Sequence, residues 1–317
     1  IKYATYSAGP AHLEAMDAMI VEFEKQHPDI KVEVEVIGFD DYFTKLLTQA
    51  SSKTLPDVFE MNYENFNTYA GNGVLLDLTD LADGDEDFSP DMLTGNTYEY
   101  FQNDGKLYGL TEKVSDVVLY YNKDMFDAAG LEYPQADWTW DDLLAASQAL
   151  TKDGVYGFYA PVTYNELYKV VVQNGGALFD EEGNPTIDSA ENVEALQWML
   201  DKMLKYHIQP TTEEMSGKTP EDMFKNSEIA MEVTGSWMVT TFADAPFEWD
   251  IALEPGNTEQ VHHVFADGIV ASADTKNAEA AWKLIKFLST DPTAAKIRLD
   301  SSWDLPATND ESVQEQY

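Results

Sequence analysis

The first sixty residues alternate between strand-like and helix-like segments, and this order limits the folds open to the chain. Residues 2–6 form a short β-rich run, and residues 11–27 carry apolar side chains at helical spacing until Pro28 interrupts them. Residues 30–36 alternate between apolar and charged side chains, which predicts a half-buried strand. A second helix begins near Asp40, and residues 56–61 are typical of a strand. This βαβαβ order predicts a mainly parallel sheet covered by helices, with ligands at the carboxyl ends of the strands.

The rest of the chain continues the mixture of strands and helices without a flexible linker. A strand-like run at 117–121 passes directly into Asn122-Lys123-Asp124, a polar cluster that can begin a helix. Helices are predicted at 192–206, from 219 onward and at 277–288, and strands at 229–233 and 268–273. The length of 317 residues suggests about two domains. We therefore expect two α/β lobes that are joined by strands.

Charge and cysteine content exclude several classes of function. The chain has 58 acidic and 19 basic residues, a net charge of −39, which repels nucleic acids and anionic lipid surfaces. It has no cysteine, which excludes disulfides, thiolate catalysis and cysteine-ligated metals. No apolar run is long enough to span a membrane. The first residue is Ile1, so we expect that a signal segment was removed or left out.

The motifs of common enzymes and cofactor sites are missing from the sequence. It contains no Gly-x-Ser-x-Gly elbow, no phosphate-binding glycine loop and no His-Glu-x-x-His pair. The acidic run 83–87 resembles the start of a calcium loop, but Phe88 stands where such a loop needs glycine. We expect a solvated acidic loop there, with calcium as the alternative. We predict no catalytic residue, no metal and no cofactor.

Aromatic residues are the strongest sign of a binding site. Seven Trp and 17 Tyr are many for one chain, and several stand beside amides or acids in expected loops, as in Asn62-Tyr63, Tyr164-Asn165-Glu166 and Gly235-Ser236-Trp237. Sugars present apolar C–H faces to aromatic rings and a rim of hydroxyls to amides and carboxylates. The pattern therefore favours a carbohydrate cleft, although aromatic side chains that fill the lobe cores would give the same count.

Several ordered landmarks make the chain similar to a known family. They are Leu55-Pro56-Asp57-Val58, Gly73-Val74-Leu75-Leu76-Asp77-Leu78, Leu119-Tyr120-Tyr121-Asn122-Lys123, Asn174-Gly175-Gly176, Gly235-Ser236-Trp237, Asn277-Ala278-Glu279-Ala280-Ala281-Trp282 and Leu305-Pro306-Ala307. The chain resembles the extracellular solute-binding proteins of ABC sugar importers, in the maltose- and oligosaccharide-binding branch. The resemblance implies a two-lobed α/β fold of the type II periplasmic-binding-protein class. Each lobe would be a mainly parallel sheet flanked by helices, and hinge strands would join the lobes. The N-terminal lobe would hold 1–113 plus 268–300, and the C-terminal lobe 118–262 plus 303–317. The crossings would lie near 114–117, 263–267 and 300–303.

The resemblance also implies a set of ligand-binding residues. They are Tyr6, Ser7, Asn62, Tyr63, Glu64, Ser115, Asp116, Tyr164, Asn165, Glu166, Tyr168, Trp237, Asp267 and Trp303. Trp237 matches the aromatic residue that commonly stacks on a sugar in this family. At two places the sequence differs from the family pattern, and both concern the layout of the sugar subsites. Many members carry tryptophan where this chain has Tyr3 and Tyr6, and many carry Gly-Gly near 265–268.

The implied function is capture of a neutral oligosaccharide between two lobes for import. The protein would be a monomer that does no chemistry on its ligand and docks on membrane permease subunits. We expect an extracytoplasmic location, as a lipoprotein on the surface of a Gram-positive bacterium. Two alternatives stay open, a secreted carbohydrate-active enzyme and a receptor for a cationic solute such as a polyamine, which Glu64, Asp116, Glu166 and Asp267 could attract. Family members continue beyond Ala307 with further helices, so an incomplete C-terminal end is a further expectation.

Overall fold

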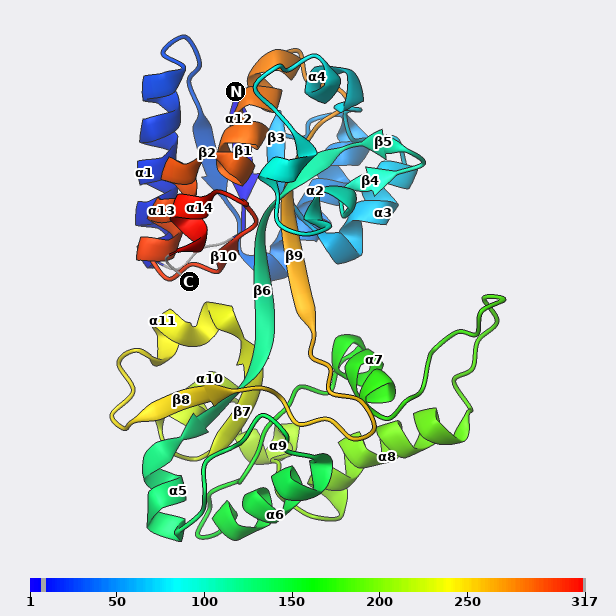
Figure 1. Ribbon diagram of the computed structural model, residues 1–317, viewed down its shortest axis with the longest axis vertical. Coiled ribbons are helices and arrows are strands. Elements are labelled where there is room, and N and C mark those ends of the chain that lie inside the picture. Colours follow the sequence, from blue (N-terminus) through cyan, green and yellow to red (C-terminus); the bar gives the residue numbers. More distant parts are fainter. Residues whose placement is uncertain (7–9, 316–317) are drawn as a thin grey trace. The chain divides into compact units, whose positions relative to one another are not determined.

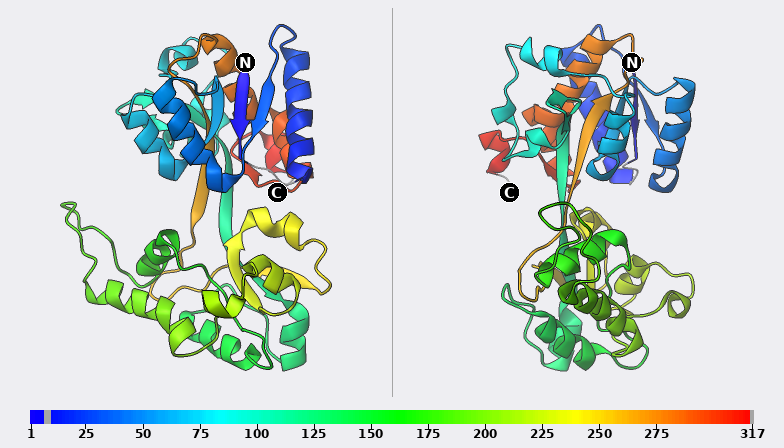
Figure 2. Two further views of the ribbon diagram at one scale, coloured as in Figure 1. Left: turned by 180° about the vertical axis from the view of Figure 1, so that it is seen from behind. Right: turned by 90° about the vertical axis from the view of Figure 1, so that its right-hand side faces the viewer.

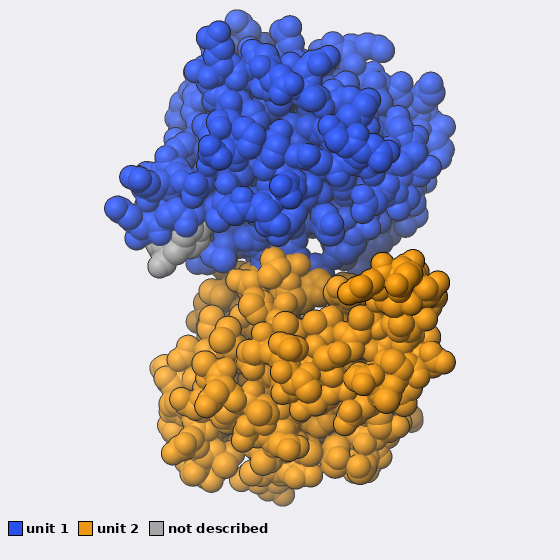
Figure 3. Space-filling view, turned by 45° about the vertical axis from the view of Figure 1, so that its right-hand side comes forward, with its two compact units in different colours: residues 1–115, 265–317 blue, residues 116–264 orange. Residues whose placement is uncertain are grey.

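The chain folds into two compact units, which Figure 3 distinguishes by colour. The computed structural model describes residues 1–6 and 10–315. Unit 1 contains residues 1–115 and 265–317, and unit 2 contains residues 116–264. The chain passes between the units within two strands, β6 (Gly109–Asn122) and β9 (Val264–Ala271). Among the described residues, no helix is both long and apolar enough to cross a membrane.

Unit 1 contains most of the strands (Figure 1). Its other strands are β1 (Lys2–Thr5), β2 (Glu33–Val36), β3 (Val58–Asn62), β4 (Gln102–Asn103), β5 (Lys106–Leu107) and β10 (Leu305–Pro306). Its α-helices are α1 (Pro10–Gln26), α2 (Phe39–Ser52), α3 (Tyr63–Gly71), α4 (Thr79–Asp83), α12 (Ala278–Thr290), α13 (Pro292–Asp300) and α14 (Glu311–Gln314). Single 3₁₀ turns lie at Pro90–Met92 and Thr97–Glu99.

Unit 2 is mainly helical. It adds the strands β7 (Met231–Gly235) and β8 (Trp249–Ala252) to the second half of β6. Its α-helices are α5 (Lys123–Ala129), α6 (Trp140–Leu150), α7 (Tyr164–Gln173), α8 (Ala190–Leu204), α9 (Thr212–Met215), α10 (Pro220–Lys225) and α11 (Val239–Phe242), and a 3₁₀ turn lies at Ser236–Met238.

The polar cluster after β6 begins a helix, as the sequence predicts. The Asn122 side chain caps α5 by accepting a hydrogen bond from the Met125 amide at 3.0 Å. The next helix, α6, begins with a reciprocal capping box between Thr139 and Asp142. These local bonds set the helix starts in the segment that follows β6.

The α/β class is confirmed, and the strand directions are mixed. In unit 1 the sheet order is β10-β6-β9-β3-β1-β2, in which β2, β1 and β3 are parallel, as the βαβαβ pattern predicts. Strand β9 is antiparallel to β3, because it enters unit 1 at the end of the sheet where β3 stops. In unit 2, β7 and β8 both run antiparallel to β6, which differs from the mainly parallel sheet we expected there.

Helices cover both faces of the sheet in unit 1. Neighbouring residues of each strand point to opposite faces, so Tyr3 and Val58 join one core whereas Ala4 and Phe59 join the other. The first core is completed by α1, α12 and α13, and α1 and α13 lie side by side in Figures 1 and 2. The second core is completed by α2 and α3. Both faces of the sheet are therefore packed with apolar side chains, so we expect polar side chains at the ends of the strands.

The C-terminal segment 303–317 belongs to unit 1 and not to the second lobe, where we had expected it. Strand β10 pairs with the first half of β6, with Leu305 opposite Val114, and the Ala307 amide donates to the Glu112 carbonyl at 3.1 Å. Trp303 and Ala307 are both buried in the first core of unit 1. These contacts hold the segment in unit 1, to which α13 also belongs. No boundary between the units therefore lies near 300–303.

Candidate functional site

The predicted residues of unit 1 gather at one end of its sheet. Strand β1 ends just before Tyr6 and the parallel strand β3 ends at Asn62. Asn62 is paired in register with Asp267 of β9, and the Tyr6 hydroxyl donates a hydrogen bond to Asp267 Oδ1. The structure therefore brings together Tyr6, Asn62 and Asp267, which were predicted from three distant segments. Ser7 lies outside the described residues.

The residues after β3 extend this strand end with exposed groups. The Asn62 side chain caps α3 by accepting from the Asn65 amide at 3.3 Å, and Tyr63 and Glu64 form the exposed first turn of that helix. Tyr63 is 46% exposed and packs obliquely on Tyr100, with ring centroids 5.6 Å apart. The backbone of α3 thus presents a ring and a carboxylate beside the buried strand end.

A buried ion cluster lies behind the Tyr6–Asp267 hydrogen bond. Lys113 of β6 is 2% exposed, lies 3.1 Å from Asp267 Oδ2 and also binds the carboxylate of Glu60 on β3. Glu60 accepts further hydrogen bonds from the Thr5 hydroxyl at 2.5 Å and from the Tyr6 amide at 3.2 Å. A single buried lysine of β6 therefore binds carboxylates of both β3 and β9.

The cluster changes the pKa of each member. Burial by itself would lower the pKa of Lys113, but the carboxylates of Asp267 and Glu60 outweigh burial and raise it. Burial opposes ionisation of Glu60, yet Lys113 holds its pKa below the usual range. Burial raises the pKa of Asp267 despite the nearby lysine. Burial also raises the pKa of the Tyr6 hydroxyl, so that this group stays a neutral hydrogen-bond donor.

Trp303 does not lie on the surface of the candidate site. It is 1% exposed, its ring stacks on the His12 imidazole with centroids 5.0 Å apart, and the Arg298 guanidinium lies 4.2 Å from its centre. Arg298 in turn forms a buried ion pair with Glu112. The structure therefore gives Trp303 a packing role in unit 1, because its side chain is almost completely buried.

The first crossing contributes one buried and one exposed residue. Ser115, the last residue of this part of unit 1, is 2% exposed within β6. Asp116 begins unit 2 and lies 3.4 Å from His262 Nε2, with both side chains about 40% exposed. The amide of Val117 donates to the His263 carbonyl at 2.9 Å, which ties the two crossing segments together within unit 2.

Trp237 follows the end of β7 in unit 2. Gly235 is paired with Val117 of β6, and a Cβ at Gly235 would lie 1.9 Å from the indole ring of Trp237. The absence of a side chain at Gly235 thus lets the ring lie against the backbone. Trp237 is partly exposed and packs on the core of unit 2.

Helix α7 separates its polar residues between two faces. Thr163 caps its first turn, and the spacing i, i+4 places Tyr164 and Tyr168 on one exposed face, at 67% and 45% exposure. Asn165 is half-buried. Glu166 is buried and pairs with Lys169 at 2.6 Å. The two tyrosines can therefore offer rings to a ligand, whereas Glu166 is part of an internal ion cluster.

This second ion cluster lies within unit 2 and contains Glu166, Lys169 and Glu254. Lys169 also pairs with Glu254, and the buried Lys202 lies over the rings of Phe158 and Trp198 at 4.8 and 5.5 Å. Burial lowers the pKa of Lys202 to about 8 and raises that of Glu254 to about 7. Glu166 and Lys169 also act on the nearby His263, whose pKa burial lowers. The α7 residues therefore lie close to the segment that leaves unit 2.

The acidic loop 83–87 already has partners within the protein. Asp85 accepts hydrogen bonds from Lys286 Nζ at 2.6 Å and from Trp282 Nε1 at 2.8 Å. Across the described residues, no group of three or more potential ligands could hold a metal ion. The Asp85 carboxylate is therefore held by bonds to α12 of the same unit.

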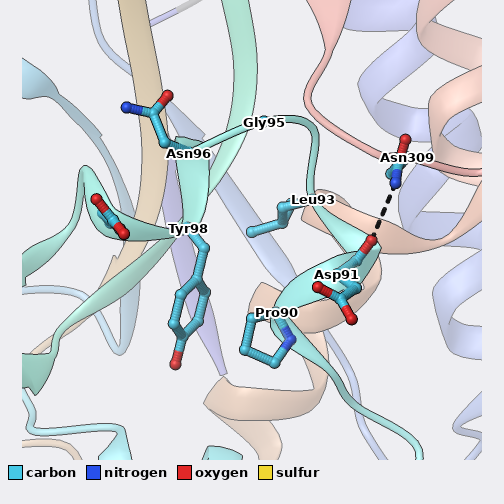
Figure 4. A pocket seen from close by; sticks show the side chains of 8 residues that line it. Pro90, Asp91, Leu93, Gly95, Asn96, Tyr98 and Asn309 are labelled. Carbon is cyan, nitrogen blue, oxygen red and sulfur yellow. Dashed lines mark hydrogen bonds between the residues drawn. The ribbon is translucent and has the colours of Figure 1, made fainter.

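One surface pocket of unit 1 contains none of the predicted residues. Its volume is about 240 Å³, and Asn309 Nδ2 donates to the Asp91 carbonyl at its rim at 3.2 Å (Figure 4). Pro90 and Tyr98 contribute rings to its wall. We assign it no part in the candidate site.

Sequence reasoning missed the ions behind the site and one exposed ring. Glu60 stands between the apolar residues Phe59 and Met61, and a charge inside a buried strand is a sign that a partner is needed. The partner, Lys113, is 53 residues away and could not be identified without the strand pairing. Phe39 is 56% exposed and meets the Tyr6 ring edge-on at 5.2 Å, and no motif singled it out.

The chain matches a described protein family, a solved structure and curated relatives. Residues 9–295 match the family described as bacterial extracellular solute-binding protein. An ABC substrate-binding protein of Listeria monocytogenes, solved in complex with cycloalternan, superposes with a TM-score of 0.96. It is 49% identical, and the match covers all of this chain and 82% of that one.

Curated relatives are more distant. An arabinooligosaccharide-binding protein of Halalkalibacterium halodurans is 30% identical over 63% of this chain, and that match covers only 45% of the relative. A galactooligosaccharide-binding protein of Bacillus subtilis is 26% identical over 91% of this chain and 68% of its own length. Because the family match extends over residues 9–295, the chain belongs to the bacterial extracellular solute-binding protein family.

Proposed function

We propose that this protein is the substrate-binding component of an ABC importer and that its ligand is a neutral oligosaccharide. The observation that carries the proposal is the 49% identity, over the whole chain, to the Listeria protein whose structure contains cycloalternan. Relatives named for oligosaccharides of arabinose and galactose support the same ligand class. Cycloalternan is therefore the first ligand to test.

The chemistry of each unit suits a sugar. In unit 1, Tyr6, Asn62 and Asp267 provide hydroxyl, amide and carboxylate groups, and Phe39 and Tyr63 provide exposed rings. In unit 2, Trp237 and the two tyrosines of α7 provide aromatic faces. Aromatic rings that stack on C–H faces, together with a few polar groups for the hydroxyl rim, are what carbohydrate recognition requires.

The proposed mechanism treats the two units as lobes. Ligand contacts that both lobes make at once would exist only in the closed form, so the ligand would shift the population toward closure. Strands β6 and β9, which carry the chain between the units, would act as the hinge. The closed form would deliver its sugar, chemically unchanged, to membrane permease subunits. We further propose a monomeric lipoprotein on the outer face of a Gram-positive cell membrane. The Listeria and Bacillus sources of two relatives support the choice of organism class.

The ion pairs weigh against the polyamine alternative. A cationic ligand needs carboxylates whose charge is available, but Glu166 is paired with Lys169 and Asp267 with Lys113. Among the described residues, Glu64 and Asp116 form no ion pair with a lysine, and Asp116 faces His262 instead. We therefore favour a sugar over a cationic ligand.

A thermal-shift screen tests the ligand class. The plate would hold cycloalternan, linear oligosaccharides, monosaccharides, polyamines and calcium, since a ligand of the native state raises the melting temperature by mass action. We expect a shift with an oligosaccharide series, and chromatography should recover the sugar intact after incubation. Shifts with polyamines alone would contradict the sugar proposal, and a hydrolysed sugar would indicate the enzyme alternative.

A further inference from the structure

We propose that Lys113 is a positioning residue of the unit 1 ligand site, which fixes the Asp267 carboxylate and, through it, the Tyr6 hydroxyl for contact with a sugar. This inference rests on the proposed function. It concerns a residue that is almost completely buried and would not itself touch ligand, since 2% of its side chain is exposed. Its effect would pass through Asp267, whose side chain is 13% exposed.

Two donors from different segments hold the Asp267 carboxylate. Lys113 Nζ lies 3.1 Å from Oδ2, and the Tyr6 hydroxyl donates to Oδ1. Lys113 Nζ also lies over the Tyr6 ring, 5.4 Å from its centre, so the lysine is near both members of the pair. A carboxylate offers about four lone-pair positions, so two oxygens held in this way can still accept hydrogen bonds from a ligand.

Glu60 makes the lysine necessary. Glu60 is 1% exposed and binds the same ammonium, which therefore lies between two carboxylates from neighbouring strands. Without Lys113 these carboxylates would share a buried site, and one of them would have to take up a proton. The other titratable and charged groups around the cluster include Glu64, Glu112, Arg298, His12, Asp304, Tyr3, Tyr6 and Tyr42. Arg298 is already bonded to Glu112.

A purely structural role for Lys113 makes a different prediction. In that case the lysine would serve only to neutralise Glu60, and removing both charges together would restore the protein. In the positioning role, the double replacement would restore stability but not ligand affinity, because Asp267 would still lack its anchor. The variants Lys113→Met and Lys113→Met with Glu60→Gln separate these roles.

The experiment measures affinity and protonation separately. Calorimetry with cycloalternan would give Kd for the wild type and for both variants between pH 5.5 and 8.5. In the ligand-free proteins, carbon-13 NMR would follow the Asp267 carboxyl, assigned with Asp267→Asn. Lys286→Met is the matched control, because it removes a partly buried lysine that pairs with Asp85 in the same unit but outside the site.

We expect both Lys113 variants to bind cycloalternan about tenfold more weakly or worse at pH 7, the effect of one lost charge-assisted hydrogen bond. The double variant should regain the melting temperature of the wild type, and the control should keep wild-type affinity. The Asp267 carboxyl should titrate at higher pH in Lys113→Met than in the wild type.

Recovery of affinity in the double variant, or an Asp267 titration unchanged by Lys113→Met, would overturn the inference. If Lys113→Met does not fold, the ligand affinity and the Asp267 titration would be measured on the double variant instead. If the wild type binds no sugar, the proposed function fails, and the ligand-free titration still decides whether Lys113 controls Asp267.

Discussion

Glu232 offers the clearest quantitative test of the structure of unit 2. It lies in β7, is 1% exposed, and its Oε2 has no hydrogen-bond partner among the described residues. Burial, with a smaller effect of the Glu221 charge, raises its pKa from 4.5 to about 9. The folded protein should therefore hold a proton on this carboxyl at neutral pH, whereas the unfolded chain releases it.

The sign of the pH effect follows from this difference. Because the folded-state pKa is raised, the contribution of Glu232 to stability is complete below pH 4.5 and is lost progressively up to about pH 9. Each pH unit in this interval costs about 1.4 kcal/mol, so the loss at pH 7 is about 3 kcal/mol. Glu232→Gln keeps the shape of the side chain and removes its titration. The variant should be about 3 kcal/mol more stable than the wild type at pH 7, and less than about 1 kcal/mol more stable at pH 5.

Urea unfolding followed by tryptophan fluorescence at pH 5, 6, 7 and 8 would measure this difference. The exposed Glu248, just before β8 in the same unit, provides the control, and Glu248→Gln should change the free energy of unfolding little at any of these pH values. A stability difference between Glu232→Gln and the wild type that stays constant from pH 5 to pH 8 would refute the reasoning.

Three further predictions concern the site and the buried ions. Trp237→Ala should weaken ligand binding by about 1–3 kcal/mol, as loss of one stacked ring does, and unchanged affinity by calorimetry would remove Trp237 from the site. Gly235→Ala should also weaken binding and change the Trp237 fluorescence spectrum, because the new Cβ would occupy the position of the indole ring; an unaltered spectrum would contradict the close packing. Arg298→Met should lower the free energy of unfolding by about 3–5 kcal/mol, since it leaves the buried Glu112 without its cation, and adding Glu112→Gln should recover much of that loss in urea unfolding.

Local features of the fold were predictable, whereas distant pairings were not. The strands and helices of the first sixty residues follow from apolar spacing and from Pro28, and the start of α5 follows from the capping side chain of Asn122. The antiparallel entry of β9 and the return of β10 to β6 depend on contacts between residues about 200 positions apart. Local periodicity contains no information on such pairings, and so the segment 303–317 was assigned to the wrong lobe.

Only some residues of the candidate site were predictable from the sequence. Tyr6, Asn62 and Asp267 follow strand ends or hinge positions, so a family resemblance could locate them, and the structure brings them together. Trp303 satisfied the same reasoning but is almost completely buried and packs against Arg298 and His12, because a sequence does not show which aromatic ring faces inward. Lys113 was missed because its role depends on two carboxylates from other strands.

The most direct test of the oligosaccharide proposal is a calorimetric titration of the wild-type protein with cycloalternan, followed by chromatography of the sugar. We predict saturable binding with one ligand per chain and full recovery of intact cycloalternan. A folded protein that gives no binding heat with cycloalternan or with any arabinose- or galactose-based oligosaccharide would contradict the proposal.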